Sequence, residues 1–318
     1  MSTYVHCSNK SGPLNSDITK LMASSSFTVL EKYQCLECAP KRSGGEEKVL
    51  AAAASIRAVN PSAPIMFYFA VDYARLWYDL GGFFDAHPEI EVHNADGSLA
   101  EVHDNDNGYN IWHVFDFAQP AAVKKWVDDI ASVVSRGNLQ GVFIDGYRGN
   151  GSISWPKDLI KKSSLAEQNA WVQAAWNETG VHLKTALPRG SIMLPNGNSF
   201  TSPPPGYNSI SVEFFAVKHI HLLRSLAKSK TFVEVHAYIG DDRALYNLTL
   251  AAYLIAAGEN AYFGAGNTWD TCESWLIDYQ ITDYQKKLGE PLADAVAHIS
   301  ASGEKRWTRR FVCRPTRC

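Results

Sequence analysis

A short apolar run ends on a single carboxylate in the segment Gly141-Val-Phe-Ile-Asp-Gly-Tyr147. Apolar residues bounded by glycines are typical of a strand buried on both faces, as in a parallel sheet. Gly146 would let a ligand approach the backbone closely. A carboxylate beside an apolar strand costs free energy unless it is paired or used. The segment therefore predicts a functional Asp145, and the alternative is that Asp145 caps the next helix or pairs with Arg148.

The same rhythm, a β-rich apolar run followed by an amphipathic stretch, recurs along the chain. Eight strands are predicted at 27–33, 65–72, 111–117, 141–147, 191–195, 209–215, 231–238 and 260–266. Helices are predicted at 45–59, 120–135, 164–178, 219–229 and 242–257. Strands separated by helices lie parallel, and eight such units close into a barrel. The sequence predicts an α/β protein with the (β/α)8 TIM-barrel fold, and a doubly wound open sheet is the alternative.

The chain has 318 residues, of which 46% are hydrophobic, enough for one large core. We predict a single domain over 1–318. Residues 1–26 would form a segment before the first strand, with a helix near 15–23, and residues 290–318 would form a C-terminal extension. The stretches 73–110 and 196–208 exceed ordinary loops between strand and helix, so they are expected to wall a cleft.

The formal net charge is −3, with 30 basic and 33 acidic residues. No basic surplus is present to neutralise phosphates or anionic lipid headgroups, so neither nucleic acid nor a membrane is expected as a partner. No apolar run has the roughly 18 residues that a membrane-spanning helix needs. The start of the chain lacks the pattern of a signal peptide. The sequence thus predicts a cytoplasmic protein, or an extracellular one if a signal was removed. It does not indicate an oligomeric state.

Acidic residues gather where the predicted strands end, which is the active face of a barrel of this kind. Asp145 ends the fourth strand and Glu213 the sixth, and these two are the predicted catalytic residues. Alternation places Glu234, His236 and Tyr238 on one face of the seventh strand. Carboxylates accept hydrogen bonds from sugar hydroxyls, and aromatic rings cover the apolar face of a sugar. The predicted sugar-binding residues are Glu31, Asp72, Asp116, Tyr147, Arg148, Asn196, Glu234, His236, Tyr238 and Trp269.

The motifs of other chemistries are absent from the sequence. It has no HExxH or EF-hand pattern, no GxSxG elbow, no P-loop and no GxGxxG, so no metal or cofactor is predicted. Cys35 and Cys38 follow the first predicted strand and Cys272 follows the eighth. Because those strands adjoin in a closed barrel, the three cysteines are expected to be neighbours, and a disulfide or an incidental cluster of thiols is favoured over zinc.

Four segments carry a resemblance to known proteins: Phe27-Thr-Val-Leu-Glu-Lys-Tyr33, Val114-Phe-Asp-Phe-Ala-Gln-Pro120, Gly141-Val-Phe-Ile-Asp145 and Tyr284-Gln-Lys-Lys-Leu-Gly-Glu-Pro291. Together they resemble the glycoside-hydrolase-like TIM-barrel family. The resemblance implies a carbohydrate ligand. In many retaining α-glycosidase barrels the nucleophile is an Asp ending the fourth strand, and in several the acid ends the sixth, positions that match Asp145 and Glu213. Other glycosidase barrels use the fourth and seventh strands, which would make Glu234 the acid.

The leading hypothesis is a glycoside hydrolase acting on an oligo- or polysaccharide with Asp145 as nucleophile and Glu213 as acid. Two carboxylates in these roles need different pKa values. Phe214 and Phe215 would favour a protonated Glu213, whereas Gly146 would leave Asp145 solvated and ionised. The alternatives are a carbohydrate-binding barrel without turnover, or a polysaccharide lyase in which His236 or a tyrosine abstracts a proton.

Overall fold

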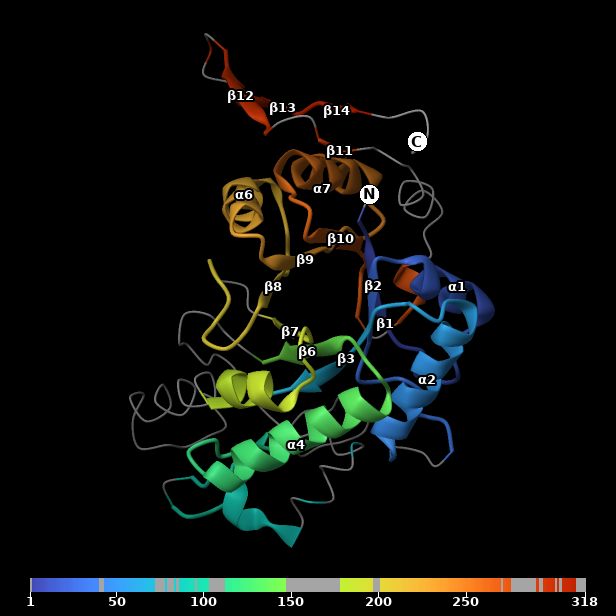
Figure 1. Cartoon of the computed structure of the whole chain (residues 1–318), viewed down its shortest axis with the longest axis vertical. Helices are drawn as coiled ribbons and strands as arrows, with labels where there is room; N and C mark the ends of the chain where they lie inside the picture. The colour runs from blue at the N-terminus through green and yellow to red at the C-terminus, as the bar shows by residue number, and fades with distance from the viewer. Residues whose placement is uncertain are drawn as a thin grey trace.

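The computed structural model describes residues 2–39, 43–71, 78, 83, 86–94, 96–102, 112–146, 178–196, 201–269, 271–275, 290–291, 294–300, 302 and 305–312. Strands and helices alternate along most of this chain (Figure 1). The strands are β1 (Tyr4–Cys7), β2 (Phe27–Leu30), β3 (Ile65–Ala70), β4 (Glu101–Val102), β5 (Trp112–His113), β6 (Gly141–Asp145), β7 (Ile192–Pro195), β8 (Ser209–Val212), β9 (Phe232–Ala237), β10 (Ala261–Ala265), β11 (Glu290–Pro291), β12 (Val296–Ile299), β13 (Lys305–Thr308) and β14 (Phe311–Val312). The α-helices are α1 (Ser16–Ser24), α2 (Gly45–Val59), α4 (Pro120–Arg136), α6 (Ile220–Lys228) and α7 (Arg243–Ala256).

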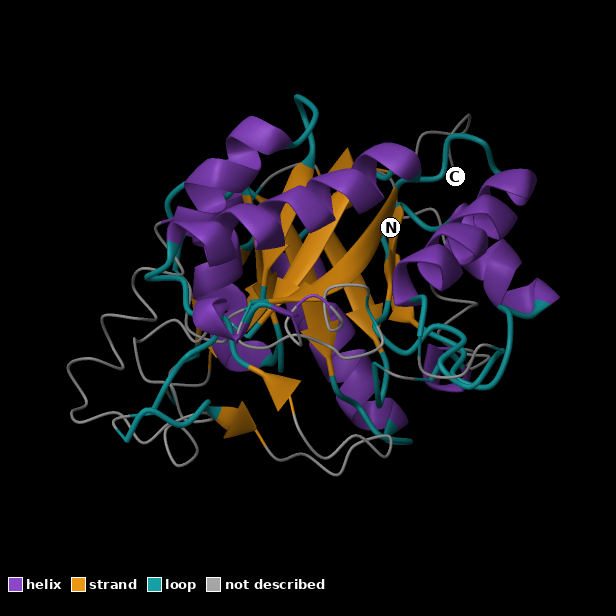
Figure 2. Ribbon diagram, turned by 90° about the horizontal axis from the view of Figure 1, so that it is seen from below, coloured by secondary structure: helices purple, strands orange, loops and turns teal. Residues whose placement is uncertain are grey.

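Eight strands lie parallel in two sheets, in the orders β1-β2-β3-β6-β7 and β10-β9-β8. Isolated parallel bridges join Thr3 to Phe263 and Asn196 to Ser211. The first bridge lies between the chain entering β1 and β10, and the second between the chain leaving β7 and β8. Figure 2 shows these strands at the centre with helices around them. The protein is therefore a mixed α/β protein built on parallel strands.

The predicted strand at 111–117 is wrong. Among the described residues of this stretch the only strand is Trp112–His113, which as β5 pairs antiparallel with β4 rather than joining the parallel strands. Phe115 forms an antiparallel bridge with Glu91. The apolar alternation of this stretch therefore serves a small local antiparallel structure. Alternation alone reports that one face is buried, not which strand lies beside it.

The N-terminal segment 1–26 was also misjudged, because it contains β1. This strand, Tyr-Val-His-Cys, pairs in parallel with β2 and is buried along its whole length. The strand was not predicted because it contains His6, whereas a buried strand is expected to be continuously apolar. The two errors offset each other in the count of parallel strands. β6 remains the fourth, β8 the sixth and β9 the seventh.

The helices begin where their sequences predict. The side chain of Asn15 accepts from the backbone of Asp17 and Ile18 at the start of α1, and Asp242 does the same for α7. Pro120 opens α4, where its missing N–H is not needed. Of the predicted helix at 164–178, only Glu178 is among the described residues. None of the helices described is both long and apolar enough to cross a membrane.

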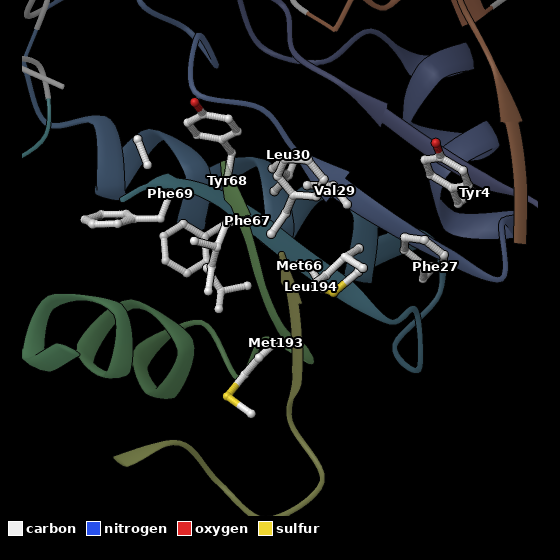
Figure 3. Close-up of a cluster of buried hydrophobic side chains, with 14 of the residues drawn as sticks. Tyr4, Phe27, Val29, Leu30, Met66, Phe67, Tyr68, Phe69, Met193 and Leu194 are labelled. Carbon is white, nitrogen blue, oxygen red and sulfur yellow. The ribbon is translucent and has the colours of Figure 1, made fainter. Parts of the chain in front are cut away.

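Alternation along the parallel strands places one set of side chains beneath the strand ends. Figure 3 shows Tyr68 on the opposite side of β3 from Phe67. Tyr68 pairs in register with Phe143 of β6, so both lie on the same face as Asp145, two residues further along. At the other end of this layer the rings of Tyr4 and Phe27 stack 4.9 Å apart. The fold thus brings Tyr68 and Asp145 to one face of neighbouring strands.

Two disulfides are present among the described residues, and neither joins the Cys35 loop to Cys272 as the sequence suggested. Cys7, the last residue of β1, is bonded to Cys272, and Cys35 is bonded to Cys38. The first and last parallel strands do lie side by side, as the Thr3–Phe263 bridge shows. The first of them is β1 rather than β2, so the cysteine that meets Cys272 is Cys7.

Removing the Cys7–Cys272 bridge is expected to destabilise the protein strongly. This bridge spans 265 residues, whereas Cys35–Cys38 spans 3, and the chain entropy that a bridge removes from the unfolded state grows with loop length. Replacing both cysteines of the long bridge by alanine should lower the free energy of unfolding by roughly 2 to 5 kcal/mol. Urea unfolding without reductant measures this. The matched control is the Cys35→Ala/Cys38→Ala pair, and an equal loss in both variants would contradict the account.

Candidate active site

The side chain of Asn196 lies between the carboxylates of Asp145 and Glu213. Its Nδ2 donates to Asp145 Oδ1 at 3.1 Å and to Glu213 Oε2 at 3.1 Å. An amide nitrogen carries two N–H groups, so it can serve both acceptors at once. The two carboxylate oxygens share one nitrogen as a neighbour and therefore lie no more than about 6 Å apart, within the range for a pair that flanks one glycosidic bond.

The backbone holds Asn196 in this place. It directly follows β7, its N–H donates to Ile144 O at 2.7 Å, and it forms the parallel bridge to Ser211. Asp145 closes β6, and Glu213 comes directly after β8. Three successive parallel strands thus each contribute one polar side chain to the same edge of the fold.

Asp145 is surrounded by groups that favour its ionised form. Tyr68 Oη donates to Asp145 Oδ2 at 2.8 Å. Burial raises the pKa of the Asp145 carboxyl, but the charge of Lys32 and the hydrogen bonds from Tyr68, the Gly146 backbone and Asn196 outweigh it, so the pKa lies below its ordinary value. Gly146 has a φ of 94°, a conformation that glycine adopts without strain. Asp145 is therefore an anion at neutral pH.

Glu213 has the opposite character. Tyr238 Oη donates to Glu213 Oε1 at 2.6 Å, and Trp269 Nε1 donates to the same oxygen at 3.2 Å. Burial raises the pKa of Glu213, and the negative charge of Asp145 raises it further. The hydrogen bonds from Tyr238, Asn196 and Trp269 lower it, but the net pKa lies above the ordinary value. The pKa values of the two carboxyls are therefore moved apart, as an acid and a base in one site require.

An aromatic surface adjoins Glu213. Phe214 is 55% exposed and its ring stacks on that of Tyr238 at 4.6 Å. Its φ of 55° is a left-handed conformation that non-glycine residues rarely adopt. Such strain is found most often where a site needs a side chain in a particular place. Phe214 and Tyr238 together offer a flat apolar face beside the carboxylate pair.

Glu234 and His236, both predicted to bind sugar, lie in the interior instead. Each is fully buried on β9. Glu234 Oε1 lies 3.8 Å from Nδ1 of His6, and His236 Nδ1 lies 3.1 Å from the hydroxyl of Tyr4. The ring of Trp269 covers both histidines, 3.7 Å from that of His236 and 4.3 Å from that of His6. Glu234 is thus separated from the carboxylate pair by packed side chains.

The other predicted sugar ligands fall into three groups. Glu31 is buried and held by Lys32 and His6. Asp116 lies in the turn before α4, where Oδ1 accepts from the backbone of Ala118 at 3.1 Å, and no parallel strand ends there. The remaining residues predicted to bind sugar, Asp72, Tyr147 and Arg148, lie outside the described residues. Asn196, Tyr238 and Trp269 do meet at the carboxylate pair.

Three residues near the site were not predicted from the sequence: His6, Lys32 and Tyr68. His6 was not predicted because it lies in β1, which the sequence did not indicate as a strand. Tyr68 could have been found, because it lies on the face of its strand that is in register with Asp145. Lys32 directly follows Glu31 and gave no signal of its own. In the part of the chain that the structure describes, no three His, Cys, Asp or Glu side chains are placed to hold a metal ion.

Comparison with known families decides the relationship of the chain. The model of the Hypothetical glycosyl hydrolase family 15 matches residues 57–314. The chain belongs to this family. The match covers β6, β7 and β8 and therefore Asp145, Asn196 and Glu213. No curated protein sequence matches the chain.

Solved structures of similar fold include several carbohydrate enzymes. An uncharacterised protein from Listeria monocytogenes has a TM-score of 0.58 at 12% identity, covering 90% of this chain and 30% of its own. A GH31 dextranase from Flavobacterium johnsoniae, complexed with isomaltotriose, has a TM-score of 0.57 at 9% identity, covering 90% and 39%. An α-galactosidase from Lactobacillus brevis has a TM-score of 0.53 at 9% identity, covering 98% and 53%. The chain thus spans about half or less of these proteins, and the likeness is one of fold.

Proposed function

We propose that the protein is a retaining glycoside hydrolase acting on an oligo- or polysaccharide, with Asp145 as nucleophile and Glu213 as general acid and base. The observation that carries the proposal is the position of Asn196, whose one nitrogen reaches both carboxylates at 3.1 Å. Retaining enzymes hold their carboxyl groups about 5 to 5.5 Å apart, and inverting enzymes about 6.5 to 9.5 Å. The bridged oxygens lie no more than about 6 Å apart, which fits the retaining spacing, and the anomeric configuration of the first product decides between the two outcomes.

The proposal includes a (β/α)8 barrel. Eight parallel strands in two sheets support it, together with the two parallel bridges that join β1 to β10 and β7 to β8 through their flanking residues. In such a barrel the catalytic groups come from the carboxyl ends of several strands. Asp145, Asn196 and Glu213 meet this expectation on three consecutive strands.

The proposed reaction has two steps. Asp145 attacks the anomeric carbon while the bond to the leaving oxygen breaks and Glu213 gives that oxygen its proton. Water then attacks the same carbon, gives a proton to Glu213, and releases the sugar from Asp145. The lowered pKa of Asp145 favours an ionised nucleophile, and the raised pKa of Glu213 favours a protonated acid. Phe214 and Tyr238 would pack against the sugar ring.

Hydrolysis of a glycan panel tests the proposal. The panel should begin with α-glucosides and α-galactosides, because a dextranase and α-galactosidases are among the proteins of similar fold. It should also contain β-linked glycans. Release of sugar by the wild type, with the product first formed in the anomeric configuration of the substrate, is the expected result. Glycan binding without turnover would instead favour a carbohydrate-binding barrel.

Hydrolysis is expected to follow a bell-shaped pH profile with an acidic optimum. The rate should fall at low pH as Asp145 is protonated, and the lowered pKa of this carboxyl moves that limb downward. It should fall at higher pH as Glu213 loses its proton, and the raised pKa moves that limb upward. Values of kcat/KM, obtained from initial rates between pH 3 and 9, measure both limbs of the profile. A rate that rises steadily to pH 9 would contradict a protonated Glu213.

A further inference from the structure

Directly after β2, Lys32 is held by a carboxylate and by two aromatic rings, with its Nζ 4.8 Å from the centroid of Tyr33 and nearer to that of Tyr68. Its Nζ donates to Glu31 Oε1 at 3.0 Å and lies 4.3 Å from the centroid of the Tyr68 ring. The Lys32 side chain is only 12% exposed. Water therefore screens its positive charge much less than it would screen a lysine on the surface.

The ring beside Lys32 belongs to the residue that donates to Asp145. Tyr68 Oη lies 2.8 Å from Asp145 Oδ2. A cation over a tyrosine ring is attracted to its π electrons. By polarising the ring, the cation makes the phenol a stronger hydrogen-bond donor, as in any chain of polarised hydrogen bonds. The charge of Lys32 therefore reaches Asp145 both through space and through Tyr68.

We propose that Lys32 is a positioning residue for the nucleophile, and that by acting through the ring of Tyr68 it holds the Asp145 carboxylate in its ionised form. The inference rests on the proposed function, because it assigns Lys32 a part in the same reaction. It adds a residue that neither touches the sugar nor moves a proton.

Asp145 has a cation and a second carboxyl group near it, and the cation favours its ionised form. Among the described residues, the titratable groups facing Asp145 are Lys32 after β2, Tyr68 on β3 and Glu213 after β8, with Tyr238 beyond Glu213. Only Lys32 is a cation.

Buried acidic and basic side chains, in alternation, hold Lys32 in place. Glu31 is 1% exposed, and its Oε1 also lies 3.7 Å from Nε2 of His6. His6 in turn lies 3.8 Å from Glu234. Burial lowers the pKa of His6, but Glu234 and Glu31 raise it to a net value above the ordinary one. Glu234, His6, Glu31 and Lys32 therefore form a row in which acidic and basic side chains alternate, and it ends at the Tyr68 ring.

The pH profile of kcat/KM tests the inference when it is measured for Lys32→Met, Lys32→Arg, Tyr68→Phe and the Lys32→Met/Tyr68→Phe pair. In Lys32→Met the acidic limb should move upward by roughly one pH unit or more. The rate lost at low pH should largely return near the optimum, whereas a damaged fold would lower the rate at every pH. Lys32→Arg keeps the charge and should keep the wild-type limb. Lys10→Met is the matched control, because Lys10 lies over Tyr33 at 6.0 Å and should leave the limb unmoved.

The double variant shows whether Lys32 acts on Asp145 through Tyr68 or only through space. If Lys32 acts through Tyr68, the shift caused by Lys32→Met should shrink once Tyr68 is phenylalanine. Two shifts that simply add would show that the ring plays no part and would overturn the inference as stated. An unmoved acidic limb in folded Lys32→Met would overturn it entirely.

A titration without substrate separates this inference from the proposed function. The ¹³C carboxyl signal of Asp145, assigned by its loss in Asp145→Asn, reports ionisation directly. It should titrate at higher pH in Lys32→Met than in the wild type, and Lys32→Arg should restore the wild-type curve. An unchanged titration would overturn the inference even if glycans are hydrolysed. If no glycan is hydrolysed, the proposed function fails while the titration still decides what Lys32 does.

Discussion

Asp145→Asn is expected to abolish turnover while the protein stays folded and binds its glycan. The amide has almost the shape of the carboxylate and can still accept from Tyr68, but it is no longer a nucleophile and carries no charge to stabilise the positive charge developing on the sugar. The kcat should fall by roughly three orders of magnitude or more. Hydrolysis rate, glycan affinity and melting temperature, taken on the same preparation, measure the three properties.

Asp242→Asn is the matched control for this substitution. Asp242 caps α7 by accepting from the backbone of Ala244 and Leu245, and asparagine caps a helix about as well. The control should therefore keep both stability and activity. If folded Asp145→Asn hydrolyses glycans at the wild-type rate, Asp145 is not the nucleophile. If it fails to fold, its role is structural.

Glu213→Gln is expected to cause a loss that depends on the leaving group. Without the acid, hydrolysis of natural glycans should fall by roughly two to four orders of magnitude. A dinitrophenyl glycoside needs no protonation to depart, so formation of the glycosyl-enzyme from it should be nearly unimpaired. Because water is no longer activated, this intermediate should accumulate, and added azide should release it as a glycosyl azide. The high-pH limb of the profile should disappear, since it reports the proton of Glu213.

Glu259→Gln provides the comparison for Glu213→Gln. Glu259 is exposed and precedes β10, at the opposite end of the strands from the carboxylate pair. This variant should retain the wild-type rate on every substrate. Equal losses on natural and activated glycosides in Glu213→Gln would show that Glu213 does not protonate the leaving group.

The meeting of Asp145 and Glu213 could be predicted from the sequence because each acid stands at the end of an apolar strand. Parallel strands bring their carboxyl ends to one edge, so Asp145 and Glu213 were expected to meet without knowledge of the exact pairing. Asp145 and Glu213 remain at the ends of the fourth and sixth parallel strands although two strands were predicted wrongly. The unrecognised strand β1 and the supposed strand at 111–117 lie on the same side of β6 in sequence, so the positions of β6 and β8 in the order did not change.

The depth of a side chain along its strand could not be predicted in the same way. Alternation correctly placed Glu234, His236 and Tyr238 on one face of β9 and its continuation, but only Tyr238 reaches Glu213. Glu234 lies four residues earlier and is fully buried. Its partner His6 belongs to a strand that the sequence did not reveal. A period of two residues tells which face a side chain takes, not how far it lies from the edge.

The most direct test of the account is to trap the covalent intermediate. A fluorinated glycoside of the hydrolysed sugar, with a good leaving group, forms a glycosyl-enzyme that breaks down slowly enough for peptide mapping by mass spectrometry. The account predicts one sugar per protein, attached to the peptide that contains Asp145, and no label on Asp145→Asn. A label on Glu213 or Glu31, or hydrolysis with inversion and no label at all, would contradict it.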